Sequence, residues 1–190
     1  MKKLLTLFFA LAVIVSLDSC SFFDPKAGGD SEGWKSQEVE EEAKYKYYQE
    51  TYEKTYDAPF QTVWNSALEA VEDDNCQIIT KKTSQNDMGL YQGLIRSDYC
   101  IFARGDTTLD NLKYYSLEVP FIRGSSWITG RIQYEFDIDE QEDGTVHVLL
   151  EGEISGYEKQ VTSKMHFWES NGYLETMMLQ KLTDKVKKAK

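Results

Sequence analysis

The sequence offers few side chains of the kinds that carry out catalysis. His147 and His166 are its only histidines, and neither lies in the HExxH spacing that brings two imidazoles to one zinc ion. A nucleophile elbow requires GxSxG, but in Gly152-Glu153-Ile154-Ser155-Gly156 the serine comes one position too late. Glycine patterns for phosphate or dinucleotide binding are absent as well. We therefore expect a protein that is not an enzyme and that carries no cofactor.

One acidic stretch imitates part of a metal site. Asp139, Gln141, Asp143 and Gly144 supply the alternating oxygen ligands and the glycine of the first half of a calcium-binding loop. The twelfth position of that loop requires a bidentate glutamate, but it is Leu150 in this chain. The letters EDGT around Gly144 indicate a hairpin turn instead. We interpret the stretch as a solvated turn and expect no metal.

The first residues have the pattern of a secretion signal. Lys2 and Lys3 precede an apolar run from Leu4 to Leu17, and Ser19 is a small residue directly before Cys20. A positive start, an apolar run and a small residue at the cleavage point are typical of exported proteins. The run is too short for a permanent membrane span, which takes about 20 apolar residues.

Leu17-Asp18-Ser19-Cys20 resembles the lipobox of bacterial lipoproteins. The resemblance implies that residues 1–19 are a lipoprotein signal peptide and that Cys20 carries fatty chains such as palmitate. Each buried methylene contributes about 0.8 kcal/mol, so two or more chains anchor a protein stably. By enterobacterial sorting, Ser21 after the cysteine implies an outer-membrane location in the cell envelope, facing the periplasm. The alternative is an ordinary signal peptide and a free Cys20.

Charge narrows the range of partners. The chain has 32 acidic and 21 basic residues, a formal net charge of -11. Such a protein repels phosphate backbones and anionic lipid headgroups. This excludes nucleic acid as a partner, and it also excludes attachment to a membrane through basic residues. We expect the lipid bilayer to be reached through acylated Cys20 and the remaining partner to be another envelope protein.

Cys76 and Cys100 are the other two cysteines. They have no CxxC spacing and no histidine cluster nearby, so a zinc site is not expected. An exported compartment would permit a disulfide between them. Because both lie in apolar, strand-like runs, two buried thiols are the favoured interpretation.

Composition and periodicity divide the chain after the leader. Residues 20–44 are predicted to be the acylated cysteine and a flexible tether, since Ser21 to Ser36 is rich in Gly, Ser and Asp. Residues 45–190 are predicted to form one domain. Tyr48, Tyr52 and Tyr56 recur every four residues, a spacing that fits one face of either a strand or a helix. The aromatic and threonine content favours a first strand. Asp57-Ala58-Pro59 then predicts the start of a helix. The apolar residues of this helix recur at helical spacing: Phe60, Val63, Trp64, Ala67, Leu68 and Val71.

From Cys76 onward, apolar residues alternate with polar ones, which predicts a meander of about five or six strands. The strand-like segments are CQIITKKT, GLYQGLIRSDYCIFARG, LKYYSLEV, the alternation from Ile128 to Ile138, and its hairpin partner from Val146 to Ile154. The closing NGYLETMMLQKLTDKVKKAK predicts a long C-terminal helix. The expected fold class is therefore α+β, a curved antiparallel sheet with one helix after the first strand and a long final helix.

The stretch from Thr55 to Phe60, followed by Val63-Trp64 and Ala67-Leu68, resembles the opening of helix-grip domains. That superfamily includes START-like ligand binders and the related small domains of the outer-membrane assembly lipoprotein C. The resemblance covers the range from Tyr52 to Lys187 in the order of elements. It implies that the final helix lies across a curved sheet, with core or a hydrophobic ligand between them.

Two functions follow as hypotheses. The first is a non-catalytic envelope lipoprotein that acts as a protein-binding or assembly accessory module, since tyrosine and tryptophan dominate interface energies. Its candidate partner-binding residues are Trp34, Tyr45, Tyr47 and Tyr48, although these rings could instead pack on the domain's own sheet. The second is a carrier or sensor of a hydrophobic ligand held between the C-terminal helix and the sheet. Its candidate cavity residues are Trp64, Leu68, Met177 and Met178, where a filled core is the favoured interpretation.

Overall fold

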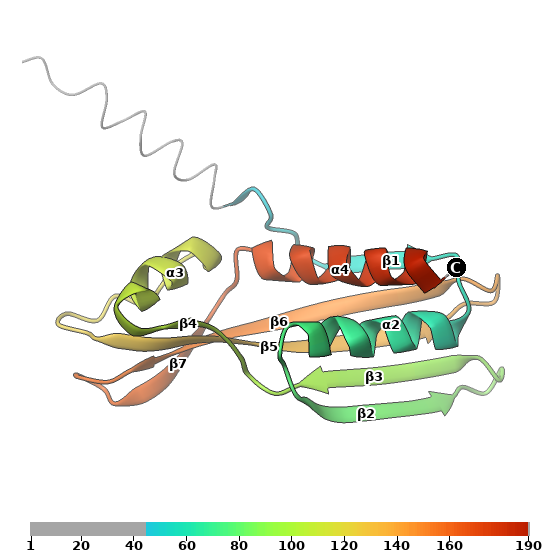
Figure 1. Ribbon diagram of the computed structural model, residues 1–190, viewed down its shortest axis with the longest axis horizontal. Coiled ribbons are helices and arrows are strands. Elements are labelled where there is room, and N and C mark those ends of the chain that lie inside the picture. The colour runs from blue at the N-terminus through green and yellow to red at the C-terminus, as the bar shows by residue number, and fades with distance from the viewer. Residues whose placement is uncertain (1–44, 190) are drawn as a thin grey trace, which may run out of the picture.

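The computed structural model describes residues 45–189. These residues form an open antiparallel sheet with helices packed on one face, which confirms the predicted α+β class (Figure 1). Cys20, Trp34 and the segments predicted as leader and tether lie outside the described residues. Within that part of the chain, no helix is both long and apolar enough to cross a membrane.

The described sheet has seven strands, where about six were predicted. They are β1 (Tyr52–Tyr56), β2 (Ile78–Gln85), β3 (Tyr91–Ser97), β4 (Cys100–Arg104), β5 (Trp127–Glu140), β6 (Val146–Glu158) and β7 (Lys164–Trp168). The helices are α2 (Phe60–Asp73), α3 (Thr108–Tyr115), which follows a short 3-10 turn, and α4 (Tyr173–Ala189).

Two long strands run the length of the sheet, and shorter strands pair with each of them in turn (Figure 1). Along β5, β3 pairs with one end and β4 with the other. Along β6, β1 pairs as far as Leu150 and β7 only from Ile154 onward. Residues 151–153 of β6 therefore have a strand neighbour on the β5 side alone.

The core lies between the sheet and the two longer helices. α2 and α4 lie next to each other on the same face of the sheet (Figure 1). The alternation predicted for β5 is confirmed from Ile132 to Ile138, because Ile132, Tyr134, Phe136 and Ile138 are buried. Ile128, which was predicted on the same face, is only half-buried and lies at a shift in the β5–β6 register. From the helices, Val63, Trp64, Met178 and Leu182 fill the same core cluster.

The segment LKYYSLEV was predicted as a strand, and that prediction is wrong. Its first half belongs to helix α3, and Ser116 makes an isolated bridge to Ser170. The reason is packing: Leu112 is completely buried, and a Cβ at Gly130 of β5 would lie 2.7 Å from its Cδ2 atom. Gly130 in the sheet thus allows helix α3 to approach closely. The strand-like composition of LKYYSLEV does not reveal this contact. Strand β7 was not predicted at all.

Cys76 and Cys100 form a disulfide, with their Cα atoms 5.1 Å apart. The favoured interpretation as two free thiols is therefore wrong. Cys76 follows the end of α2, whereas Cys100 begins β4. Their pairing depends on the return of the β2–β3 hairpin to the end of α2, which no local sequence pattern specifies.

Candidate functional site

Three of the predicted partner-binding tyrosines lie in the leading segment (residues 45–51), just before β1. Tyr45 and Tyr48 are exposed, and their rings meet edge to face with centroids 6.1 Å apart. Tyr47 points the other way and packs edge to face on Tyr173 at the start of α4, with centroids 5.0 Å apart. Tyr47 and Tyr48 line two different cavities, whereas Tyr45 lines neither of them.

The cavity beside Tyr47 has a volume of about 800 Å³ and is here named the tyrosine groove. It lies between the leading segment, α3, the loop after α3 and the start of α4. Its lining residues are Lys46, Tyr47, Asp110, Lys113, Tyr114, Ser116, Leu117, Glu118, Val119, Asn171 and Tyr173. A groove of this size accommodates several side chains of a partner or a small ligand.

The rings of the tyrosine groove contact one another in series. Tyr114 lies 4.9 Å from Tyr115 and 5.7 Å from Tyr173, measured between ring centroids. Tyr115 and Tyr173 are 5.5 Å apart. Tyr114 remains 59% exposed, so the cluster presents a large aromatic surface to solvent. Rings fixed by neighbouring rings lose little side-chain entropy on binding, which favours affinity.

The walls of the groove are tied together by polar contacts. Asn171 Nδ2 donates a hydrogen bond of 2.8 Å to the carbonyl oxygen of Tyr114. Trp168 Nε1 donates one of 2.6 Å to Ser116 Oγ. These bonds join the end of α3 to the segment before α4, so the groove is held open by the fold.

The charged residues of the groove carry both signs. Lys46 Nζ lies 5.1 Å from the centroid of the Tyr47 ring, within the range of a cation–π contact. Lys113, Asp110 and Glu118 also line the cavity. Aromatic and aliphatic surface combined with charges of both signs suits an amphipathic protein segment.

The cavity beside Tyr48 is smaller, about 240 Å³, and is here named the acidic notch. It lies where β6 lacks a neighbour between β1 and β7. Its lining residues are Tyr48, Gln49, Glu50, Thr51, Tyr52, Leu149, Leu150, Glu151, Gly152, Glu169, Ser170 and Glu175. Tyr48 Oη donates a hydrogen bond of 3.2 Å to Glu169 Oε1, which raises the pKa of Tyr48.

Glu175 is the unexpected residue of the notch, since its side chain is almost fully buried at 1% exposure. Its Oε2 accepts a hydrogen bond of 2.8 Å from Ser170 Oγ. Burial raises the pKa of this carboxyl above its usual range. Room for it is provided by Gly152, where a Cβ would overlap Oε1. The only sequence signal was a glycine inside an alternating strand, which indicates a close approach by another group.

Replacing Glu175 by glutamine is expected to remove a pH-dependent loss of stability. A carboxyl with a raised pKa binds its proton more tightly in the folded state, so it destabilises the fold as pH rises from about 4.5 through that raised pKa. The variant should be more stable than the wild type at pH 8, and the difference should shrink toward pH 4. Urea unfolding of both proteins across this range measures it. A difference independent of pH would contradict the assignment.

Glu158 is a second buried carboxylate, but its role is structural. Its oxygens accept hydrogen bonds from the backbone amides of Ser126, Gln160 and Thr162, at 2.9, 2.7 and 2.6 Å. Burial alone would raise the pKa of Glu158, yet these bonds outweigh it and hold the pKa well below the usual range. These hydrogen bonds occupy the oxygens of Glu158 and hold the turns beside β7, so the carboxylate is not free to bind a ligand.

Three of the four predicted ligand-cavity residues meet in the core, and the fourth does not. Trp64 and Met178 are buried in the core, and Leu68 packs against it. Met177 is 39% exposed and is not part of that cluster. None of these four residues lines the tyrosine groove or the acidic notch.

Each histidine has a polar side chain nearby. His147 Nε2 lies 3.4 Å from Glu53 Oε2, and His166 Nε2 shares a hydrogen bond of 2.8 Å with Thr162 Oγ1. In residues 45–189, no cluster of three or more His, Cys, Asp or Glu side chains has the arrangement of a metal site.

Comparison of the chain with protein-family models, with curated proteins and with solved structures gave no match.

Proposed function

We propose that this protein is a lipid-anchored accessory protein of the bacterial envelope that binds another envelope protein through the tyrosine groove. The proposal places acylated Cys20 in the outer membrane on its periplasmic side, and it rests for this anchor on the lipobox-like sequence. The observation that carries the binding role is the groove of about 800 Å³ with its cluster of tyrosine rings.

The chemistry of the groove supports a protein partner. Tyrosine is one of the residue types enriched among the side chains that dominate binding energy near the centres of protein interfaces. Leu117 and Val119 add aliphatic surface, and lysines and carboxylates add polar contacts. A partner segment that fits this groove has apolar side chains that pack on the tyrosine rings, and polar groups that contact the charged residues at the margin of the groove.

The groove also lies close to the proposed anchor along the chain. Residues 21–44 number 24, and a fully extended chain of that length reaches at most about 80 Å. Lys46 and Tyr47 line the groove directly after this segment. A partner bound there would therefore be held within that distance of the bilayer.

Crosslinking in intact cells, with labelled palmitate and tagged full-length protein, tests the anchor and the groove separately. The Cys20→Ser variant is expected to lose the label and to leave the membrane fraction. Tyr114→Ala combined with Tyr47→Ala should keep the label but capture its partner at least about 30-fold less well, as expected for a loss of roughly 2 kcal/mol from two central tyrosines.

Tyr91→Ala is the matched control, because Tyr91 is an exposed tyrosine at the start of β3 and lies outside the groove. It should leave both the label and the captured partner unchanged. Equal capture by the groove variant and the wild type would refute the binding role. Label that persists on Cys20→Ser would refute the anchor.

A further inference from the structure

The face of the sheet opposite the helices is covered by no described element (Figure 1). Because side chains alternate along a strand, the residues of β5 that point away from the core belong to this open face. They are Arg131, Gln133, Glu135, Asp137 and Asp139. Their cross-strand neighbours on β6 are Ser155, Glu153, Glu151, Leu149 and His147.

The centre of the open face brings like charges together. Glu135 lies directly opposite Glu151 in the β5–β6 register, and Asp137 is two residues further along. Burial and the charge of Glu135 raise the pKa of Asp137. Arg96 pairs with Glu135, whereas neither Asp137 nor Glu151 has a cation as ion-pair partner within residues 45–189. Like charges opposed across strands cost stability, and such local conflicts are expected at functional or strained sites.

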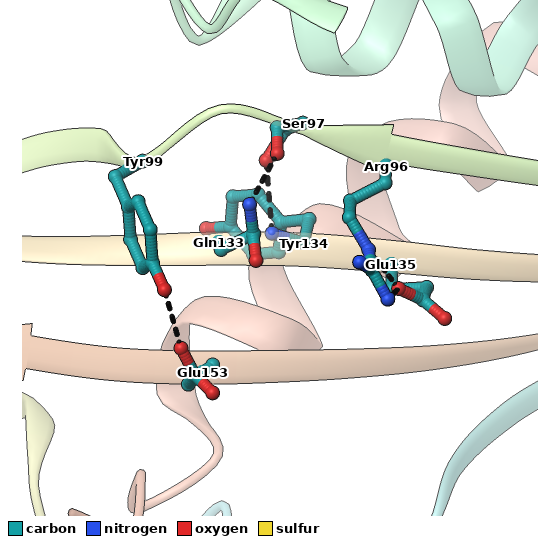
Figure 2. A network of polar contacts seen from close by, with 7 residues as sticks. All are labelled: Arg96, Ser97, Tyr99, Gln133, Tyr134, Glu135 and Glu153. Atoms are coloured by element: carbon teal, nitrogen blue, oxygen red, sulfur yellow. Dashed lines mark hydrogen bonds and ion pairs between the residues drawn. The ribbon is translucent and has the colours of Figure 1, made fainter. Parts of the chain in front are cut away.

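Beside the carboxylates, one tyrosine crosses the open face. Figure 2 shows Tyr99 extending from the β3–β4 connection over β5 toward β6, where its Oη donates a hydrogen bond of 2.6 Å to Glu153. The guanidinium of Arg131 lies 4.5 Å from the centroid of the Tyr99 ring. Phe167 of β7 approaches the same ring, with centroids 6.3 Å apart.

Two buried polar atoms under this cluster lack partners. Within residues 45–189, Arg131 Nε and Ser155 Oγ have no hydrogen-bond partner, and the two residues face each other in the β5–β6 register. Ser155 is completely buried. A buried donor without a partner costs about 1–3 kcal/mol. Next to them, Phe167 and Ile101 are 52% and 42% exposed, which adds apolar surface to the cluster.

We propose that the open face is a second interaction surface, and that it binds a basic segment of a partner protein. Lysine or arginine side chains of that segment would bind Glu135, Asp137 and Glu151 and relieve their mutual repulsion. An apolar side chain would pack on Phe167 and Ile101. Displacement of Tyr99 would then let Arg131 Nε donate to an oxygen of the partner, and let Ser155 Oγ bond to its backbone.

Charge decides which partner fits. A row of carboxylates repels anionic headgroups and nucleic acid phosphates, as well as a second copy of a chain with a net charge of -11. The described carboxylates do not form a metal-binding cluster. Of the partners considered, a basic polypeptide is the one that fits. The long-range electrostatic field of an acidic protein would also accelerate its association. This surface is separate from the tyrosine groove and does not depend on it.

The test uses the full-length protein in detergent micelles and a fluorescent probe peptide, Lys-Phe-Lys-Thr-Lys-Phe-Lys. Asp137→Asn combined with Glu151→Gln is expected to weaken binding about tenfold or more, measured by fluorescence anisotropy. The matched control, Asp106→Asn combined with Glu142→Gln, removes the same charge from two exposed turns and should change the affinity less than about twofold.

Two further readouts separate a site from general charge attraction. The Nε–H signal of Arg131 in an NMR spectrum should shift on peptide addition to the wild type, and Phe167→Ala should weaken binding without any change of charge. Tyr114→Ala should bind the peptide normally, so failure of the groove proposal would leave this result unaffected. Equal weakening by the two charge variants, or an unchanged Arg131 signal at saturating peptide, would overturn the proposal.

Discussion

Replacing Cys76 and Cys100 by alanine together is expected to lower the free energy of unfolding by about 3.5 kcal/mol. The disulfide closes a loop with a sequence separation of 24 residues, and the chain-entropy relation for a loop of that length yields roughly this value. For a domain of about this size, the loss corresponds to a melting temperature roughly 10 °C lower. The crosslink joins the end of α2 to β4, so its loss acts on both the core helix and the sheet.

The measurement is urea unfolding in a Cys20→Ser background, which removes the third thiol. A reducing agent should shift the unfolding midpoint of the protein that retains Cys76 and Cys100 close to that of the alanine variant. The variant itself should not respond to the reducing agent. A loss below about 1 kcal/mol, or equal sensitivity of both proteins to reduction, would contradict a stabilising disulfide.

Replacing Gly152 by alanine is expected to cost about 2 kcal/mol, although the position is half-buried and lines the acidic notch. A Cβ there would lie 2.8 Å from both Cγ and Cδ of Glu175, and a buried carboxyl tied to Ser170 has little room to move. Overpacking of this kind usually costs 1–3 kcal/mol. The expected result is a fall in the urea midpoint with an unchanged slope.

A double-mutant cycle shows whether Glu175 is the cause. In a Glu175→Ala background, Gly152→Ala should cost at least about 1 kcal/mol less than in the wild type, because the overlapping group is gone. Gly93→Ala is the matched control: its Cβ would overlap Trp64 instead, so its cost should be the same with or without Glu175. Additive costs for Gly152 and Glu175 would show that the glycine is required for another reason.

The elements with strong local periodicity could be predicted from the sequence. The alternation along β5 and the proline-led start of α2 both appear in the structure, and so does the long helix α4. Each pattern arises from side chains a few residues apart that share one face of an element, so neighbouring residues alone contain the information. α3 was missed because its tyrosines are typical of strands, and the packing of Leu112 beneath it depends on the tertiary structure.

The candidate sites depended on contacts between distant segments. Tyr47 was selected from the sequence for its residue type, but Tyr114 and Tyr173, which complete the groove, were not, since they come from α3 and α4. Glu175 and Gly152 likewise meet only because α4 packs against β6.

Sequence alone determined the alternating and helical patterns, the acidic charge, and the lipobox-like start on which the proposed anchor depends. Tertiary structure alone decided that Cys76 and Cys100 are paired, that tyrosines from three segments form one groove, and that one sheet face is left open and acidic. The physical reason is that periodicity and charge are properties of neighbouring residues, whereas a disulfide, a cavity and a row of opposed carboxylates require chain segments that only folding brings together.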